Sequence, residues 1–555
     1  MVMSDAMAPL KIRHFRTLWL AAMFSNLGSF LQAVAGSWLM LELTGSATWV
    51  GLMVASTTLP LFFLALPAGA LADLFDRGTI LLVSQGMMGG AAAAMAIVTY
   101  SGDISPGLLL TLGLLLGVGV AFNLPAWQAM VPDLVPRGLV ASAVALNSVA
   151  FNVARAVGPA IGGLILATSG PELAFGLNAA SYAIVIAVIF SIRGQLSVAD
   201  HDASSIPNAI ALGIRFARYT KPFRRLLLLA SLFAITSAVI QSVLPTRTEE
   251  LGGGEFAYGL LLGAMGLGAL IGAFTRKAVV ERLGDRSIPT TITAFGVFGI
   301  LQGLAGSLAL ATAALVAIGA CWVWTLTTTN ATAQLMSPEW VRGRTMSLYT
   351  LSFVGIIPFG SIIAGALADA IGAGAATVTL SVGTVVLGTT ARRFAVPALA
   401  EIDSPEFSLE RTGPDHISTQ GGPVMVVNTW VIDHDRFDEF IAVMNEVKAI
   451  RMRTGAYRWR LYRNAVNPHR LSEVFHLVSW DEHLAQHRRI DDSSRILLRS
   501  ARDFDVEQSP TTYHLIAVDT EAPDDWDVLV AAHEDYHASD GSIPLSPEPR
   551  PATDR

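Results

Sequence analysis

Residues 69–78 read GALADLFDRG and place Asp73, Asp76 and Arg77 between two segments that carry almost no charge. Each of those segments, at 48–72 and 79–100, has the roughly 20 apolar residues that a helix needs to cross a bilayer. The chain of 555 residues is 52% hydrophobic and only 15% charged, which lies outside the usual balance of soluble domains. The stretch is therefore expected to connect two transmembrane helices.

Apolar segments of similar length continue on both sides of this connection as far as residue 396. The first follows a short basic start, as in a signal peptide, but it is too long for a signal-peptide core and further spans follow it. The predicted fold is an all-α membrane protein. We expect twelve transmembrane helices, at residues 17–41, 48–72, 79–100, 106–130, 139–168, 172–192, 224–245, 256–275, 288–308, 309–335, 345–369 and 373–395.

Positive charges orient these helices. Of the 21 lysines and arginines before residue 397, 19 fall at the N-terminus, in the connections after even-numbered helices, or just after the last helix. The exceptions are Arg155, inside the fifth helix, and Arg247 on the other side. The positive-inside rule then predicts a multi-pass protein of the cytoplasmic membrane with both termini in the cytoplasm. A basic connection at 194–222 separates two six-helix halves, 1–193 and 223–396.

The composition changes after residue 396, where 28 acidic residues face 16 basic ones. A polar linker is expected at 397–422, and a soluble domain at 423–518, where strand-like and helix-like patterns follow the order βαββαβ. This order predicts a small α+β domain of the ferredoxin-like type. The remaining residues, 519–555, are rich in Asp, Pro and Ser and are expected to be disordered.

An internal repeat links the two halves. The stretch VPDLVPRG at 131–138 aligns with MSPEWVRG at 336–343, before the fifth and eleventh helices. Three glycines in and after the fifth helix have counterparts in the second half: Gly158, Gly163 and Gly170 correspond to Gly360, Gly365 and Gly372. GALAD also recurs at 365–369, but in helices two and eleven, which are not partners in this duplication, so that echo is expected to be chance.

Twelve helices in two similar halves, with GALADLFDRG after the second, resemble the major facilitator superfamily over residues 15–396. Its loop signature is kept at Gly69, Asp73 and Arg77, whereas Leu74 stands where an arginine is expected and Gly78 where a basic residue is common. FRTLWLA, GPAIGG and RGRTMSLY are similar to the branch that contains the enterobactin exporter, macrolide efflux proteins and lysophospholipid transporters.

The resemblance implies a gate around this loop. In the superfamily the loop aspartate faces the start of helix eleven, where the helix dipole and basic neighbours favour a carboxylate. Asp73 and Arg77, with Arg342 or Arg344 opposite, would then hold the cytoplasmic side shut. The alternative is that these charges only mark a solvated loop.

The fifth helix carries GPAIGG, with Gly158, Pro159, Gly162 and Gly163. Glycines permit close helix approach, and the proline removes one backbone hydrogen bond and permits a bend. The run resembles the signature of exporters that work by antiport. The alternative is ordinary packing of small residues.

Polar residues within the predicted helices are candidates for a substrate cavity near the midplane. Arg155 lies deep in the fifth helix, where an arginine is costly and by default functional, with Asn152 one turn earlier. It either binds a polar or anionic group of a substrate or pairs within the protein. Further candidates on other helices are Gln32, Gln241, Trp324 and Thr328.

Several functions are excluded or weakened by what the sequence lacks. No phosphate-binding loop is present for direct use of ATP, and Cys321 is the only cysteine, so disulfides and cysteine metal sites are excluded. Nucleic-acid binding, a metal and a cofactor are not expected. Glu42 and Asp369 sit near the outer ends of helices, so proton coupling is implied only by the resemblance.

The function predicted from the sequence is secondary export of small amphipathic molecules, such as drugs or siderophore-like metabolites, by alternating access and proton antiport. The alternative is a facilitator that moves lysophospholipid between leaflets.

The soluble domain adds a weaker hypothesis. Its order and the run SWDEHLAQHRR resemble small dimeric domains related to antibiotic-biosynthesis monooxygenases, which implies either a membrane-anchored, cofactor-independent monooxygenase or a homodimerisation or regulatory module. His483 and His487 have a spacing that suits a metal, but the sequence shows no third ligand, and tryptophans at 430, 459 and 480 could line a pocket. Dimerisation or regulation is favoured, and the chain is not expected to be an enzyme.

Overall fold

The computed structural model describes residues 7–74, 76–193, 206–338, 340–392, 423–507 and 511–517. It divides into two compact units, which are described separately. The membrane unit holds both six-helix halves, and the second unit holds a sheet domain together with Pro207–Arg224 and Ser337–Thr345. The predicted linker at 397–422 and tail at 519–555 lie outside the described residues.

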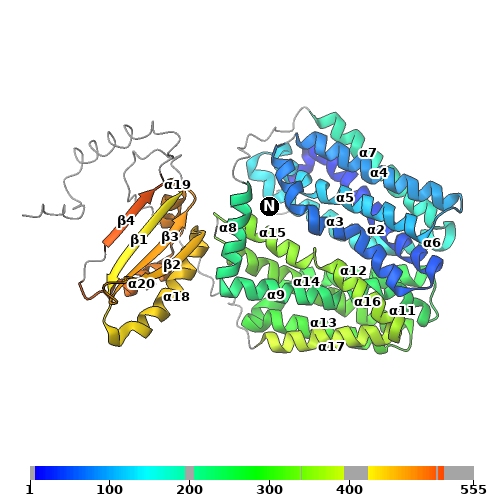
Figure 1. Cartoon of the computed structure of the whole chain (residues 1–555). Helices are drawn as coiled ribbons and strands as arrows, with labels where there is room; N and C mark the ends of the chain where they lie inside the picture. Colours follow the sequence, from blue (N-terminus) through cyan, green and yellow to red (C-terminus); the bar gives the residue numbers. More distant parts are fainter. Residues whose placement is uncertain are drawn as a thin grey trace, which may run out of the picture. The chain divides into compact units, whose positions relative to one another are not determined.

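The first half of the membrane unit is built from six long helices that begin and end at local sequence signals (blue to cyan in Figure 1). Pro106 and Pro171 stand in the first turns of their helices, where a missing N–H costs nothing, and Ser105 caps the former. The helices are α2 (Arg13–Thr44), α3 (Ala47–Leu74), α4 (Arg77–Tyr100), α5 (Pro106–Met130), α6 (Val140–Ser169) and α7 (Pro171–Ile192), with η1 (Ala8–Lys11), η2 (Val131–Leu134) and η3 (Arg137–Leu139) between or before them.

The second half repeats this arrangement with more breaks (green to yellow-green in Figure 1). Gly170 and Gly372, which the repeat pairs, both adopt positive φ, at 82° and 90°, at the junction of two helices. The elements are α9 (Lys221–Ser237), α10 (Val239–Ser242), α11 (Leu244–Glu250), α12 (Glu255–Leu283), η6 (Gly284–Arg286), α13 (Ser287–Leu304), α14 (Leu308–Leu335), α15 (Arg342–Phe353), α16 (Ile357–Ile371) and α17 (Ala373–Ala391).

Among the described residues, 11 helical runs are long and apolar enough to cross a membrane. The run Glu255–Leu304 contains both α12 and α13, so the runs contain the twelve predicted crossings. Two predicted helices, 224–245 and 345–369, were expected to be continuous but are interrupted. The break at Val243 and the break before α16 are each followed by a proline, Pro245 or Pro358, in the first turn of the next helical segment, which cannot donate to the turn before it, whereas the break at Ala238 involves no proline.

The sheet domain has four strands in the order β2-β3-β1-β4, and every neighbouring pair is antiparallel. Apolar side chains at 3 and 4 spacing on α18, including Phe440, Met444 and Val447, pack on Trp430 and Leu471 of the sheet. This confirms the predicted small α+β domain. Its elements are β1 (Val424–Val431), η7 (His434–Arg436), α18 (Phe437–Thr454), β2 (Arg458–Arg463), β3 (Arg470–Leu477), α19 (Trp480–Arg488), α20 (Asp492–Arg502) and β4 (Thr511–Ile516); α8 (Ile206–Tyr219) precedes the second half.

Candidate functional site

A cavity of about 240 Å³ lies inside the membrane unit, and both halves contribute to its wall. Helices α2, α3 and α6 come from the first half, and α10 and α12 from the second. Most of the lining is apolar, as expected for a site that admits amphipathic molecules. It consists of Phe30, Ala33, Val34, Ser37, Met53, Val54, Thr57, Thr58, Arg155, Pro159, Gln241, Tyr258, Leu262, Met265 and Gly266.

Among the described residues of this lining, Arg155 is the only charged one and none is an Asp or Glu. Among the described residues its guanidinium has one recorded contact, with the ring of Trp322, whose centroid lies 6.0 Å from Cζ. That ring attracts the cation without accepting its N–H bonds in the manner of a carboxylate. The donors of Arg155 are therefore available to a molecule in the cavity, and Gln241 supplies a second exposed polar group.

Trp322 is held by an aromatic cluster in the second half. Its ring packs against Phe233 at 5.7 Å, Phe353 at 5.5 Å and Phe295 at 6.0 Å between centroids. Such contacts fix the orientation of the ring that faces Arg155. Sequence reasoning selected Trp324 instead, but its Nε1 donates to the carbonyl of Gly272 at 3.0 Å and packs α14 on α12.

Three other predicted cavity residues do not line the cavity. Gln32 is buried within the first half, where its amide oxygen accepts a hydrogen bond from Asn178. Asn152 donates to the carbonyl of Ser148 on its own helix at 2.8 Å. Thr328 is 1% exposed. Their sequence signal, a polar group in an apolar helix, is the same whether the group faces a cavity or another helix.

The predicted glycines of the fifth helix, α6, make two kinds of close approach. Methyl groups at Gly158 and Gly162 would lie 2.7 Å from the Phe30 Cβ and 3.2 Å from the Leu31 Cα, so these positions seat α6 against α2. A methyl group at Gly163 would lie 2.7 Å from the Cα of Gly259 in α12. The motif thus brings the two halves into backbone contact beside the cavity, which Pro159 also lines.

A second contact between the halves joins the end of α16 to the start of α3. Asp369 accepts hydrogen bonds from the Ala47 N–H at 2.6 Å, the Thr48 N–H at 3.0 Å and the Ser46 hydroxyl at 2.6 Å. A carboxylate at a helix N-terminus satisfies its free N–H groups and is favoured by the helix dipole. We call the side of the membrane unit that holds this contact the distal side; here Asp369 links the halves and is not a free surface charge.

The predicted gate residues are only partly described. Gly69 and Asp73 lie in α3, but the side chain of Asp73 lies outside the described part of the chain. Arg77 donates to Asp133 in the VPDLVPRG connection at 3.1 Å, an acceptor that sequence reasoning missed. The expected partners of Asp73 therefore stay a prediction.

Arg342 and Arg344 belong to the second unit. The Nε of Arg342 donates to the carbonyl of Ser337 at 3.2 Å, which closes the turn before α15. A methyl group at Gly213 would lie 2.9 Å from the Cβ of Arg344.

The sequence matches the family described as transmembrane secretion effector over residues 4–522. The chain belongs to this family. The prediction of a major facilitator superfamily transporter from the loop signature and the repeat is thereby confirmed. The residues that match the family include the sheet domain as well as the membrane unit.

Curated relatives of this chain are transporters by name. The multidrug efflux pump Tap of Mycobacterium tuberculosis is 27% identical over 410 residues, 72% of this chain and 96% of Tap. The staphyloferrin A transporter of Staphylococcus aureus is 23% identical over 62% of this chain and 87% of its own length. The enterobactin exporter EntS of Escherichia coli is 27% identical over 64% of this chain and 85% of its own length.

Solved structures share the fold of the membrane part. A bacterial homologue of the human lysosomal transporter Spinster, inward-facing and unoccupied, has a TM-score of 0.56 at 16% identity and covers 70% of this chain and 96% of that one. The POT family transporter PepTSo has a TM-score of 0.58 at 13% identity and covers 69% of this chain and 98% of its own. The protein is therefore a multi-pass membrane transporter with the fold of the major facilitator superfamily.

The sheet domain of this secretion effector gathers three histidines. The Nε2 atoms of His483 and His487 are 3.3 Å apart, and the ring of His514 on β4 lies 4.7 Å from that of His483. Burial lowers the pKa of His483 to about 3 and that of His487 to about 4. His514 is the third histidine that the sequence did not reveal, but no group of three His, Cys, Asp or Glu in the described residues is arranged to hold a metal ion.

Proposed function

We propose that this protein is a secondary exporter of small amphipathic molecules that carry an anionic or acceptor-rich group. The observation that carries the proposal is Arg155, which faces a cavity between the halves with an aromatic ring as the sole recorded contact of its guanidinium among the described residues. The relatives named for drug efflux and for siderophore transport support the class of cargo.

Arg155 would bind its cargo through the planar fork of the guanidinium, which matches a carboxylate with two parallel hydrogen bonds. A desolvated guanidinium costs at least about 2.5 kcal/mol in a membrane segment unless acceptors are supplied. A cargo that supplies them gains this energy, whereas a neutral apolar molecule does not. The apolar remainder of the cavity would take the hydrophobic part of the cargo.

Alternating access on this proposal uses contacts at both ends of the bundle. The Asp369 cap and the Gly163–Gly259 approach close the distal side. We infer that Asp73 and Arg77, with Arg342 or Arg344, form the latch on the opposite side when the distal side opens. Asp73→Asn should then lower transport strongly with normal membrane insertion, and normal transport in this variant would rule the latch out.

Both termini are proposed to be cytoplasmic, because 19 of the 21 cations before residue 397 then face the cytoplasm. Export would be driven by protons. With Asp369 engaged by three donors, Glu42 is the carboxylate proposed to carry the proton; it accepts from Trp38 at 2.7 Å, and the Trp38 ring stacks on Tyr258 of the other half. Glu42→Gln should therefore remove the dependence of transport on a pH gradient.

The decisive experiment measures uptake of labelled compounds into inside-out vesicles, with and without a pH gradient. The panel pairs each organic acid with its neutral amide. Arg155→Lys should weaken transport of the acids, because an ammonium cannot reproduce the fork, and Arg155→Ala should abolish it. Arg286→Lys and Arg286→Ala, at an exposed arginine outside the cavity, are the matched controls.

Melting temperatures of the same variants separate binding from structure. A binding role predicts that Arg155→Ala keeps its melting temperature in detergent and loses acid transport. A destabilised variant with unchanged affinity for the acids would end the binding proposal. Movement of labelled lysophospholipid between leaflets without any gradient would instead favour the facilitator.

The sheet domain is proposed to mediate homodimerisation rather than catalysis. Tyr513 and Leu515 are 50% and 47% exposed on β4, an edge strand of the sheet formed by the described residues, and the outer backbone groups of an edge strand can pair with a second copy. Leu515→Arg should convert the purified protein to monomers in light scattering, whereas Val466→Arg, at an exposed residue outside the sheet, should not. A monomeric wild-type protein would contradict the proposal.

A further inference from the structure

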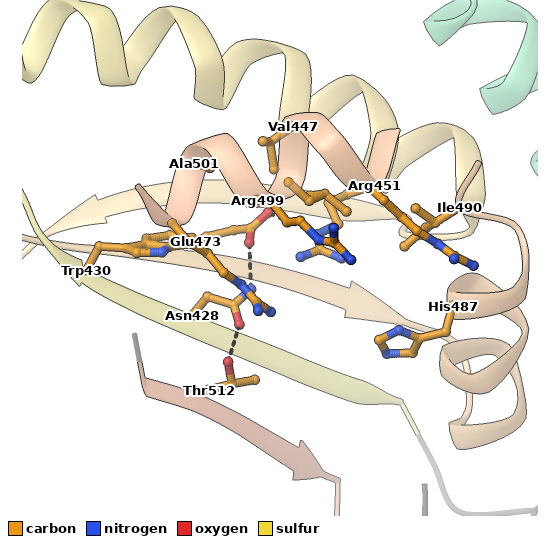
Figure 2. Close-up of a pocket in the computed structure, with 13 residues that line it drawn as sticks. Asn428, Trp430, Val447, Arg451, Glu473, His487, Ile490, Arg499, Ala501 and Thr512 are labelled. Atoms are coloured by element: carbon orange, nitrogen blue, oxygen red, sulfur yellow. Dashed lines mark hydrogen bonds and ion pairs between the residues drawn. The ribbon is translucent and has the colours of Figure 1, made fainter. Parts of the chain in front are cut away.

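The sheet domain contains its own cavity, separate from the transport cavity and about 280 Å³ in volume (Figure 2). Asn428, Trp430, Glu473 and Thr512 reach it from the sheet, and the other walls are α18, the segment from α19 to α20, and α20 itself. The volume is close to the lower end of ligand pockets, about 300 Å³, which suits a small molecule.

Charge in this cavity is strongly unbalanced. Its described lining holds four arginines, Arg451, Arg495, Arg499 and Arg502, and one carboxylate, Glu473. Low-dielectric walls strengthen the field of such a cluster and favour a negatively charged occupant.

The single carboxylate is already engaged. Glu473 is fully buried and accepts from the Asn428 amide at 2.6 Å, the Trp459 indole at 2.8 Å and the Nε of Arg451 at 3.3 Å. Asn428 in turn accepts from the Thr512 hydroxyl at 2.8 Å, and Figure 2 shows Asn428 between these two partners. This network fixes the floor of the cavity and engages Glu473 with Arg451, away from Arg499 and Arg502.

Trp430 adds a buried donor to the cavity wall. Trp430 lines the cavity with 5% of its surface exposed, and its indole N–H has no hydrogen-bond partner in the described structure. A buried N–H without an acceptor is unfavourable, so the position is improved by a ligand that supplies one. Arg499 and Arg502 are exposed at the cavity rim. The side chain of neither forms a hydrogen bond or ion pair with another described residue.

We propose that this cavity is a binding site for a small organic anion, whose carboxylate or similar oxyanion lies among the arginines of α18 and α20 and accepts from Trp430. Val447, Ile490 and Leu498 supply apolar wall for the remainder of the ligand. The site is distinct from the transport cavity, so the proposal stands whether or not Arg155 binds cargo.

Isothermal titration calorimetry on the full-length protein in detergent tests this site, with benzoate as the probe and benzamide as its neutral analogue. Benzoate should bind with a saturable isotherm that weakens as salt is added, and inorganic phosphate should compete with it. Benzamide should not bind. Equal affinity for benzoate and benzamide would overturn the proposal, because the arginines would then contribute nothing.

Matched variants locate the binding. The double variant Arg499→Gln with Arg502→Gln should lower the affinity for benzoate by about tenfold or more, which is the loss expected for charged hydrogen bonds. Arg488→Gln removes one arginine charge, against two in the double variant, from an exposed position outside the lining and should leave affinity unchanged. Affinity kept in the double variant but lost in Arg155→Lys would assign benzoate to the transport cavity and overturn the site.

Trp430→Phe provides a readout that a merely structural role would not give. The substitution keeps an aromatic ring and removes only the unpartnered N–H, so the free protein should melt at the same or a higher temperature while benzoate binds more weakly. A lower melting temperature with unchanged benzoate affinity would show that the indole N–H serves the fold and not a ligand.

Discussion

At the scale of single residues, the Arg155 guanidinium faces the ring of Trp322, whereas Trp324 on the same helix serves packing. The two tryptophans make a matched pair for a test. Trp322→Leu should weaken the binding of acidic cargo, because the cation–π contact that holds the guanidinium contributes about 0.5–2 kcal/mol. Trp324→Phe should leave affinity intact and lower the melting temperature slightly, because it loses the indole hydrogen bond shared between Gly272 and Thr275, worth about 1 kcal/mol. Equal effects of both variants on substrate affinity would contradict this assignment.

His483, which is 4% exposed, gives the sheet domain a dependence on pH. Burial lowers the pKa of His483 to about 3, whereas the pKa of a histidine in an unfolded chain is about 6.5. Between these pH values the unfolded chain binds a proton that the folded domain does not. The contribution of His483 to the stability of the domain is therefore complete above pH 6.5 and is lost as the pH falls toward 3. Scanning calorimetry should show the melting temperature falling from pH 7 to 4, less steeply in His483→Phe. His434→Phe, at an exposed histidine, should keep the wild-type slope.

At the scale of helices, the approach of α6 to α12 depends on the absence of a side chain. A methyl group at Gly163 would lie 2.7 Å from the Gly259 Cα, so Gly163→Ala must separate the helices and should favour opening of the distal side. Gly90→Ala in α4 meets nothing within 4 Å and is the control. Labelling of a cysteine placed at Thr48, in a Cys321→Ser background, should become faster only in Gly163→Ala. Unchanged labelling would show that the halves tolerate the methyl group.

At the scale of the whole molecule, all of the membrane-crossing segments found among the described residues end before residue 396. A chain ending at residue 396 should therefore insert normally and keep at least partial transport. The calorimetric transition of the sheet domain should disappear in the same chain, which also assigns that transition in the pH experiment. Complete loss of transport in a well-inserted truncation would show that the sheet domain is part of the transport mechanism.

The sequence by itself determined the class and layout of the protein. Apolar length fixed the crossings, because a bilayer demands about 20 residues whatever the neighbours are. The alternation of apolar and polar residues in strands and their 3.6-residue periodicity in helices likewise predicted the βαββαβ order, because each pattern indicates which face of an element is buried. The family followed from the loop signature around Asp73 and Arg77.

Tertiary structure alone decided which side chains meet. Periodicity says that a face is buried but not what it is buried against, so Gln32 and Trp324 looked like cavity residues although each is bonded to a neighbouring helix. Asp369, at a helix end, became a cap only because α3 begins beside it. The four arginines of the sheet-domain cavity share one space because the fold stacks α18 and α20 on the sheet, and a field of that kind depends on distances in space that the order of residues along the chain does not contain.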